Sequence, residues 1–372
     1  MEALRFNGSG SEYFKIWIVN ILLTIITLGL YYPWAKVRTR RYFYGNTTLS
    51  NRNFEYHATG KQLFVGFLIA MIFFIIYSFL GQVNPPLALS FLMIFLVALP
   101  WLIWRSLMFN MKVTSFSNVH FSFKGTLGRS YMIFLGYPLL FFIFISLIGM
   151  IVSIMIPSLG RSSFMPIVAI LLGMGIFTGY LFLIAFLKKN STEYLMNGSR
   201  YGQGKFLTKV ETKQFVILLL KSIGLSIVPV AIVSFFAQFM IHSSLLSNAE
   251  FTFILIYFIM IFMMMFVMAF YVIREREYVY KNTIFDDKIS FSSTLKARSL
   301  AWVMLSNFFL IVVTLGFAFP WAKVRVAKLM LANTLVETDN GFDEYLSQKE
   351  AEQSALGEQI GDAFDVDVGV AL

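Results

Sequence analysis

The chain has 372 residues, of which 58% are hydrophobic and 13% are charged. Soluble domains carry about 25% charged residues, so this composition argues against a soluble protein and indicates that lipid surrounds much of the surface. The sequence contains no cysteine, which excludes disulfides, a thiol nucleophile and cysteine-based metal sites.

The net charge of +10 is unevenly distributed along the chain. From Glu337 to the end, ten acidic residues face one lysine, so the preceding residues carry the whole positive excess. In a membrane protein a basic body is typical of the positive-inside rule and of anionic lipid. No nucleic-acid motif accompanies it, so we expect lipid partners and no nucleic acid. We divide the chain into a repeat-built transmembrane domain, residues 1–336, and an acidic tail, residues 337–372, whose composition predicts disorder.

The first apolar stretch, Ile16–Leu28, is short and interrupted by Asn20, and Gly29 and Pro33 follow it. No small-residue cleavage site follows a basic start, so we expect this stretch to be retained. Six longer apolar segments come next, each about as long as the roughly 20 residues that a helix needs to cross a bilayer. They are Leu63–Leu80, Leu87–Trp104, Tyr131–Ile156, Phe164–Leu187, Gln214–Ile241 and Phe251–Ile273. A last stretch, Leu300–Phe319, resembles the first, so we predict an all-α polytopic membrane protein of repeated helix hairpins.

The loops between these segments alternate in charge. Gln82–Pro86, Pro157–Ser163 and His242–Glu250 are short and hold one basic residue in total, Arg161. The other loops are long and basic: Ala35–Lys61, Arg105–Ser130, Lys188–Lys213 and Arg274–Arg298. Because lysine and arginine collect on the inner side of a membrane, we expect the long loops to be cytoplasmic.

Each basic loop contains an asparagine at a helix end, then a polar turn, then a phenylalanine. The pairs are Asn46 with Phe54, Asn110 with Phe121, Asn197 with Phe206, Asn282 with Phe291 and Asn333 with Phe342. Alternating apolar and polar residues around the turns predict short β-hairpins. A lone hairpin is marginal in water, so we expect these small cytoplasmic β-hairpins to pair with one another.

The string Pro33-Trp34-Ala35-Lys36-Val37-Arg38 returns unchanged as Pro320-Trp321-Ala322-Lys323-Val324-Arg325, and Pro100-Trp101 with Arg105 is a looser copy. Such strings are common interface anchors, in which tryptophan sits at headgroup depth. The alternative is a site for an anionic headgroup where two copies meet. The candidate residues are Trp34, Lys36, Arg38, Trp321, Lys323 and Arg325.

Asn20 and Asn307 stand at the same spacing before the two strings, inside the terminal apolar stretches. They are candidates for interhelical hydrogen bonds or for a polar lining within the membrane. The two strings cannot lie on the same face of the membrane if each terminal segment crosses it once. Either both terminal segments re-enter near Gly29 and Gly316, or each crosses once, and we favour re-entry.

No motif of a known catalytic chemistry is present. The three histidines, His57, His120 and His242, have no metal-ligand spacing, and there is no Walker A, dinucleotide or nucleophile-elbow motif. No Asp or Glu falls inside the six central segments, which argues against a proton- or cation-coupled carrier. We therefore expect a protein that is not an enzyme and that uses no cofactor or metal.

The residues do resemble a known family. Glu12-Tyr13-Phe14-Lys15-Ile16-Trp17, Thr27-Leu28-Gly29-Leu30-Tyr31, the Pro33–Arg38 string and Arg41-Tyr42 with Asn46-Thr47 resemble the YjgN-like family of bacterial inner-membrane proteins, a domain of unknown function. The resemblance implies a multi-pass protein of the inner membrane and brings no catalytic or ligand residues.

Two function hypotheses follow. The first is transport or channel activity for an anion or amphiphile, favoured by the repeats and the basic collar. The second is a non-transporting scaffold or lipid-binding protein, which would recruit a cytoplasmic or membrane protein partner through its hairpins. The residues favour no particular oligomeric state.

Orientation is directly testable, because the chain has no cysteine of its own. Single cysteines at Arg52, Lys124, Lys205 and Lys288 should all react only from the cytoplasmic side. Labelling with an impermeant maleimide in intact and permeabilised spheroplasts measures this. Periplasmic labelling at any one position would contradict the repeat assignment.

Overall fold

The computed structural model describes residues 2–159, 165–242, 249–338 and 351. It is mostly helical, as predicted. Six of its helices are long and apolar enough to cross a membrane, spanning Gly60–Val83, Pro85–Lys112, Leu127–Ile154, Ile167–Gly198, Thr212–Phe235 and Ile256–Lys281. Their positions agree with the six central segments of the sequence.

The helices form five hairpins. The two terminal ones are short, α1 (Gly10–Ile26) with α2 (Tyr32–Gly45) and α10 (Ala297–Val313) with α11 (Phe319–Ala332). The three central ones are long. They are α3 (Gly60–Val83) with α4 (Pro85–Lys112), α5 (Leu127–Tyr131) and α6 (Tyr137–Leu159) with α7 (Met165–Gly198), and α8 (Thr212–His242) with α9 (Ala249–Lys281). A π-helical turn, Met132–Gly136, joins α5 to α6.

Between the helix hairpins lie short strands that form one sheet. They are β1 (Glu2–Ala3), β2 (Arg5–Phe6), β3 (Thr47–Leu49), β4 (Arg52–Tyr56), β5 (Thr114–Phe116), β6 (Val119–Phe123), β7 (Ser199–Tyr201), β8 (Gly204–Thr208), β9 (Thr283–Phe285), β10 (Ile289–Ser293) and β11 (Thr334–Thr338). Their order is β1-β11-β10-β9-β8-β7-β6-β5-β4-β3-β2, antiparallel throughout. The hairpins pair with one another, as expected, but the prediction of small β-hairpins needs correction, because together they form a nearly closed barrel of 11 strands.

The two ends of this sheet are neighbours in the sequence. β1 pairs with β11 through Glu2 and Val336, β2 pairs with β3 through Arg5 and Thr48, and only Leu4 separates β1 from β2. The amide of Leu4 also donates to the carbonyl of Thr334 at 3.1 Å. Residues 2–6 thus bridge both edges, so every strand from β3 to β11 has a neighbour on both sides.

The same registers define a five-fold repeat. In four hairpins a phenylalanine faces an aromatic or valine on the next strand: Phe54 and Phe116, Phe121 and Tyr201, Phe206 and Phe285, Phe291 and Val336. At the fifth position, the register of β2 with β3 places Leu4 beside Leu49. The predicted fifth phenylalanine, Phe342, lies outside the described residues, and the fifth hairpin instead combines β11 with the N-terminal strand.

The helix hairpins follow the same five-fold repeat as the strands. One position at the base of the second helix of each hairpin is fully buried and is either proline or alanine, which brings the next helix close. These residues are Pro33, Pro100, Ala185, Ala269 and Pro320. Pro100, for example, accepts a 2.8 Å hydrogen bond at its carbonyl from the hydroxyl of Ser130 on α5.

The asparagines of the loop pattern mostly act as helix ends. The side chain of Asn46 donates to the carbonyl of Tyr42 at 2.8 Å, and Asn282 and Asn333 make the same bond four residues back at 2.7 and 2.8 Å. A helix leaves its last carbonyls without intrahelical donors, so this contact stabilises the transition into the strand.

The terminal segments turn back, as the re-entrant arrangement requires. Leu28 and Gly29 have positive φ angles of 48° and 92°, and Leu315 and Gly316 repeat them at 50° and 94°. Such a conformation favours glycine at the second position, because glycine has no Cβ. α2 and α11 then lead back to strands of the barrel, which puts both copies of the Pro-Trp string at its base.

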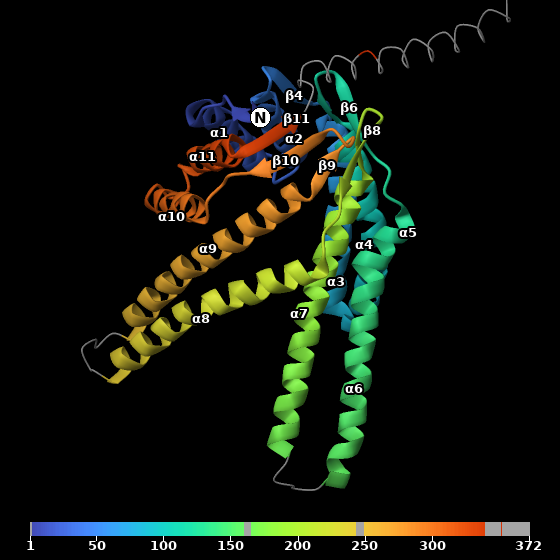
Figure 1. The fold of residues 1–372 in the computed structure, drawn as a ribbon, viewed down its shortest axis with the longest axis vertical. Helices are drawn as coiled ribbons and strands as arrows, with labels where there is room; N and C mark the ends of the chain where they lie inside the picture. Colours follow the sequence, from blue (N-terminus) through green and yellow to red (C-terminus); the bar gives the residue numbers. More distant parts are fainter. Residues whose placement is uncertain (1, 160–164, 243–248, 339–350, 352–372) are drawn as a thin grey trace, which may run out of the picture.

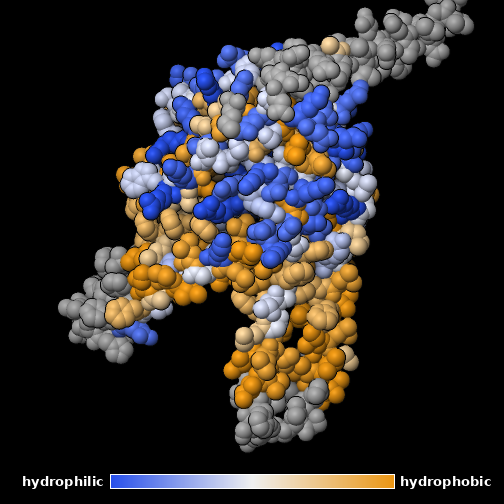
Figure 2. All heavy atoms as spheres, in the orientation of Figure 1, coloured by the Kyte–Doolittle hydropathy of each residue, from blue (hydrophilic) through white to orange (hydrophobic). Residues whose placement is uncertain are grey.

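The long hairpins extend away from the barrel as separate arms. In Figure 1, α6 and α7 run together in one direction, and α8 with α9 in another. Figure 2 shows hydrophilic residues over the barrel end and hydrophobic ones along the arms. The tail boundary needs one correction, since Glu337 and Thr338 belong to β11 and pair with Ser290 and Ile289.

Barrel closure can be tested at Leu4. Leu4→Pro removes the amide that bonds Thr334 and should open the β1–β11 edge, because proline has no N–H. Hydrogen exchange of the Thr334 and Val336 amides, which face this edge, should accelerate by roughly tenfold or more, the equivalent of about 1.5 kcal/mol of local stability. Leu4→Ala keeps the N–H and should have a smaller effect. Unchanged protection in Leu4→Pro would show that residues 2–6 do not close the barrel.

Candidate functional site

Each tryptophan of the repeated string covers the first turn of the next helix in the ring. A Cβ added to Gly60 would lie 2.2 Å from the indole of Trp34, and one on Gly10 would lie 2.2 Å from Trp321. The ring centroids of Trp34 and Phe64 are 5.2 Å apart, and those of Trp321 and Phe14 are 5.1 Å apart. The two copies therefore make the same junction, at α2–α3 and at α11–α1.

The predicted polar residues form a matching pair of contacts. Asn20 donates to the carbonyl of Ala35 at 3.3 Å, and Asn307 donates to that of Ala322 at 3.1 Å. Arg38 donates to the side-chain oxygen of Asn20 at 3.3 Å, and Arg325 donates to that of Asn307 at 2.9 Å. Both asparagines are buried. Each asparagine thus joins the two helices of its terminal hairpin.

The two lysines of the string have different surroundings. Lys323 lies over the rings of Tyr13 and Phe43, 5.4 and 4.9 Å from their centroids. Lys36 instead faces a groove between α2, α3 and α4. Within the described part of the chain, no hydrogen bond or ring contact joins Trp34, Lys36 or Arg38 to the other copy. The two copies of the string thus lie at separate junctions, and no described contact among these residues forms the joint headgroup site that the sequence offered as an alternative.

The groove has a volume of about 790 Å³ and carries four basic residues. They are Lys36 and Arg40 from α2 and Arg105 and Lys112 from α4. The apolar wall includes Leu63, Phe67 and Phe109. Partial burial, and then the charge of Arg40, lower the pKa of Lys36.

Only one of the four cations is held by strong polar contacts. Arg40 donates to the hydroxyl of Tyr56 at 2.7 Å and to the side-chain oxygen of Asn110 at 2.5 Å. Among the described residues, no carboxylate forms an ion pair with Lys36, Arg105 or Lys112. Positive charge beside an apolar wall, without a counter-charge, is suited to an anionic amphiphile.

The repeat supplies an internal comparison at α7, α8 and α9. Lys188 and Arg274 follow Ala185 and Ala269 by the same spacings at which Lys36 and Arg105 follow Pro33 and Pro100. Lys188 bonds Glu275 at 2.8 Å, and Arg274 bonds Glu277 at 2.9 Å. The equivalent cations are thus neutralised there.

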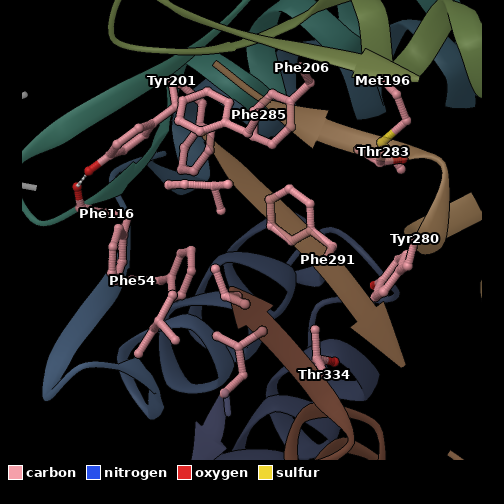
Figure 3. Close-up of a pocket in the computed structure, with 15 residues that line it drawn as sticks. Phe54, Phe116, Met196, Tyr201, Phe206, Tyr280, Thr283, Phe285, Phe291 and Thr334 are labelled. Atoms are coloured by element: carbon pink, nitrogen blue, oxygen red, sulfur yellow. Dashed lines mark hydrogen bonds between the residues drawn. The ribbon is translucent and has the colours of Figure 1, made fainter. Parts of the chain in front are cut away.

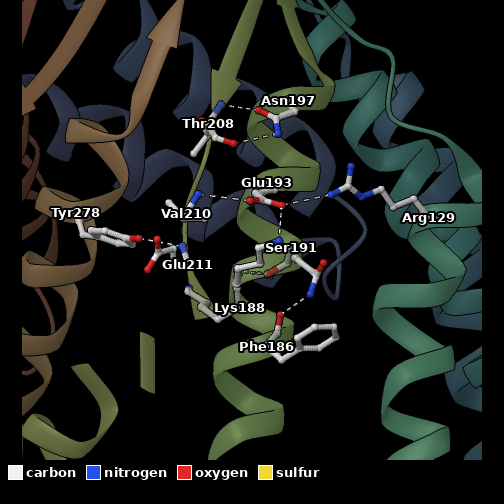
Figure 4. A network of polar contacts seen from close by, with 12 residues as sticks. Arg129, Phe186, Lys188, Ser191, Glu193, Asn197, Thr208, Val210, Glu211 and Tyr278 are labelled. Carbon is white, nitrogen blue, oxygen red and sulfur yellow. Dashed lines mark hydrogen bonds and ion pairs between the residues drawn. The ribbon is translucent and has the colours of Figure 1, made fainter. Parts of the chain in front are cut away.

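Glu193 continues this neutralised region. It pairs with Lys189 at 2.8 Å and with Arg129 of α5 at 3.5 Å, and it accepts a bond from the amide of Val210 at 3.4 Å. Figure 4 shows Glu193 between Arg129 and the loop before α8. At the α7–α8–α9 junction the cations are paired with carboxylates, whereas Lys36, Arg105 and Lys112 of the α2–α3–α4 groove have no such partner among the described residues.

A second cavity, of about 290 Å³, lies inside the barrel and is almost entirely apolar. Figure 3 shows aromatic side chains from several strands pointing into it, among them Phe54, Phe206, Phe285 and Phe291. The sequence predicted the repeated phenylalanines as parts of short β-hairpins, without a cavity between them. Their role as a cavity wall was missed, because a closed barrel was not expected. The described residues contain no group of three or more His, Asp or Glu side chains that could hold a metal ion.

Comparison with known proteins agrees with the fold. The chain is 30% identical over 358 residues to inner membrane protein YjgN of Salmonella typhimurium, covering 91% of this chain and 89% of that protein. It is 26% identical over 358 residues to the protein of the same name from Escherichia coli O157:H7, covering 90% and 88%. No solved structure matches.

These relatives and the six apolar helices support a multi-pass protein of the bacterial inner membrane. Residues 1–363 match the family described as "Bacterial protein of unknown function (DUF898)". The chain therefore belongs to this family, the one that contains the YjgN inner membrane proteins.

Proposed function

We propose that this protein is a lipid-binding membrane protein whose groove between α2, α3 and α4 holds the headgroup of an anionic phospholipid. The observation that carries the proposal is the set of unpaired cations, Lys36, Arg105 and Lys112, beside an apolar wall. The equivalent positions at α7–α9 are ion-paired, so unpaired charge is not a general property of the repeat.

The chemistry of the groove fits a phosphodiester. Arginine offers a planar fork to phosphate oxygens and lysine a compact point charge. Arg105 lies near the barrel end of α4, whose 28 residues reach well beyond a bilayer core of about 30 Å. A headgroup at this depth leaves its acyl chains alongside Leu63 and Phe67, on the apolar face of α3.

The transport hypothesis has weaker support. Two further cavities have mostly apolar walls: one lies within the α6–α7 arm, and one lies between α8, α9 and α10 and includes Arg298. The polar groove lies at the base of the helices. A binding role, without catalysis, a cofactor or a metal, is the proposal that these positions favour, and recruitment of a protein partner by the bound form is compatible with it.

The proposal predicts a charge-specific loss of lipid. Each basic contact to an anionic surface contributes about 1 kcal/mol, so Lys36→Gln with Arg105→Gln should weaken phosphatidylglycerol binding roughly 30-fold. Native mass spectrometry of the full chain, titrated with phosphatidylglycerol or phosphatidylcholine, measures this. Phosphatidylcholine binding should be weak in both proteins.

The matched control is Lys188→Gln with Arg274→Gln, which removes the same charges from equivalent but paired positions. Its phosphatidylglycerol affinity should stay near that of the unaltered chain. Equal losses in both double variants would defeat the proposal. Competition with inorganic phosphate distinguishes a phospholipid headgroup from free phosphate as the ligand. Displacement of the lipid at millimolar phosphate would mean that free phosphate is the ligand.

A further inference from the structure

The barrel cavity has a specific construction. Two sets of equivalent residues form most of its wall, one on each strand of the repeated hairpins. The first set is Leu4, Phe54, Phe121, Phe206 and Phe291, and the second is Leu49, Phe116, Tyr201, Phe285 and Val336. Met196 and Tyr280, in the last turns of α7 and α9, complete it on the side of the helices.

Side chains do not fill this interior. Within the aromatic wall the rings of Phe54 and Phe116 are 4.4 Å apart, and those of Phe206 and Phe285 are 4.5 Å apart, so the wall itself is well packed. A cavity of about 290 Å³ nevertheless remains, close to the lower end of the roughly 300–1,000 Å³ typical of small-molecule sites. Atoms that border an empty space lose dispersion contacts, which an apolar ligand restores.

One end of the cavity is polar. Thr283 and Thr334, the first residues of β9 and β11, contribute hydroxyl groups to its wall. Arg276 of α9 bonds the hydroxyl of Thr334 and, at 3.0 Å, the carbonyl of Met330, and its guanidinium lies 4.9 Å from the ring centroid of Tyr280.

The charge of Arg276 is not neutralised within the described part of the chain. Its contacts are to a hydroxyl, a carbonyl, a thioether and a ring, and its Nε is buried without a hydrogen-bond partner. A buried donor without an acceptor is unfavourable, and a buried cation more so. Arg276 does not itself line the cavity, but two residues that it contacts, Tyr280 and Thr334, do. A carboxylate bound at this end of the cavity therefore supplies a counter-charge directly behind the wall.

We propose that the barrel binds a medium-chain fatty acid, with the hydrocarbon chain among the phenylalanines and the carboxylate at Arg276 and Thr334. This site goes beyond the proposed headgroup groove and shares no wall residue with it. The two proposals can therefore fail separately.

The test is photolabelling of the full chain in nanodiscs with dodecanoic acid that carries a diazirine near its methyl end. Mapped peptides should come from the strands between Thr47 and Ser293, and unlabelled dodecanoic acid should compete roughly tenfold better than dodecanol, because a bond to a charged group is lost in the alcohol. Arg276→Gln should bring the two competitors to similar potency. Labelling confined to the arms, or the same preference for the acid in Arg276→Gln, would overturn the proposal.

A second pair of variants tests the cavity itself. Val336→Phe adds volume to the wall and should lower strand labelling at least fivefold, whereas Leu207→Phe changes a residue that is 44% exposed beside Phe206 and should not. Thermal denaturation of both establishes that they are folded. Full labelling in a folded Val336→Phe protein would contradict the site. If that variant does not fold, the position of the label and the Arg276→Gln comparison still determine whether the barrel binds the fatty acid.

Discussion

The constraint on which the structure depends is the pairing of residues 2–6 with both edges of the sheet. An unpaired edge exposes a row of backbone donors and acceptors, and proteins cover or close such edges. Here β1 pairs with β11 and β2 pairs with β3, so one short segment satisfies both edges. The arms bury little surface against one another. In the 18-residue apolar stretch of each of the six spans, only 0% to 17% of the residues are buried. The helices are thus held at their bases, by the barrel and by junctions such as Trp34 over Gly60.

The sequence carried enough information for the helices and for the repeat. Apolar runs of spanning length predicted the six long helices, and the duplicated Pro-Trp string with Asn20 and Asn307 predicted two equivalent terminal hairpins. The barrel was not predicted, for two physical reasons. Its strands are only two to five residues long, so each gives a weak alternation signal. Its closure also joins β1 to β11, and nothing local marks residues 2–6 as the partner of a strand at the other end of the chain. Phe342 appeared to complete the phenylalanine series, whereas the structure uses Leu4.

The candidate sites were predictable only in part. Basic loops indicated anionic lipid, and Lys36 is indeed one of the groove residues. Which cations are neutralised depends on pairs that are distant in sequence, such as Lys188 with Glu275, and no spacing rule identifies these. Repetition then becomes informative, because the α2–α3–α4 and α7–α8–α9 positions are equivalent in the repeat but differ in how their cations are paired. The proposed site rests on this difference rather than on the shared residues.

The closing strand also affects how the protein is made. Residues 2–3 are synthesised about 330 residues before their partners at 335–336. At roughly 5–20 residues per second, the N-terminal strand waits for roughly 15 to 70 s while all six spans are inserted. During this interval the growing sheet has two open edges, each able to pair with another chain. The β1–β11 pair forms only after residues 335–336 have been synthesised, so a product truncated before β11 keeps an open edge that chaperones and proteases can engage.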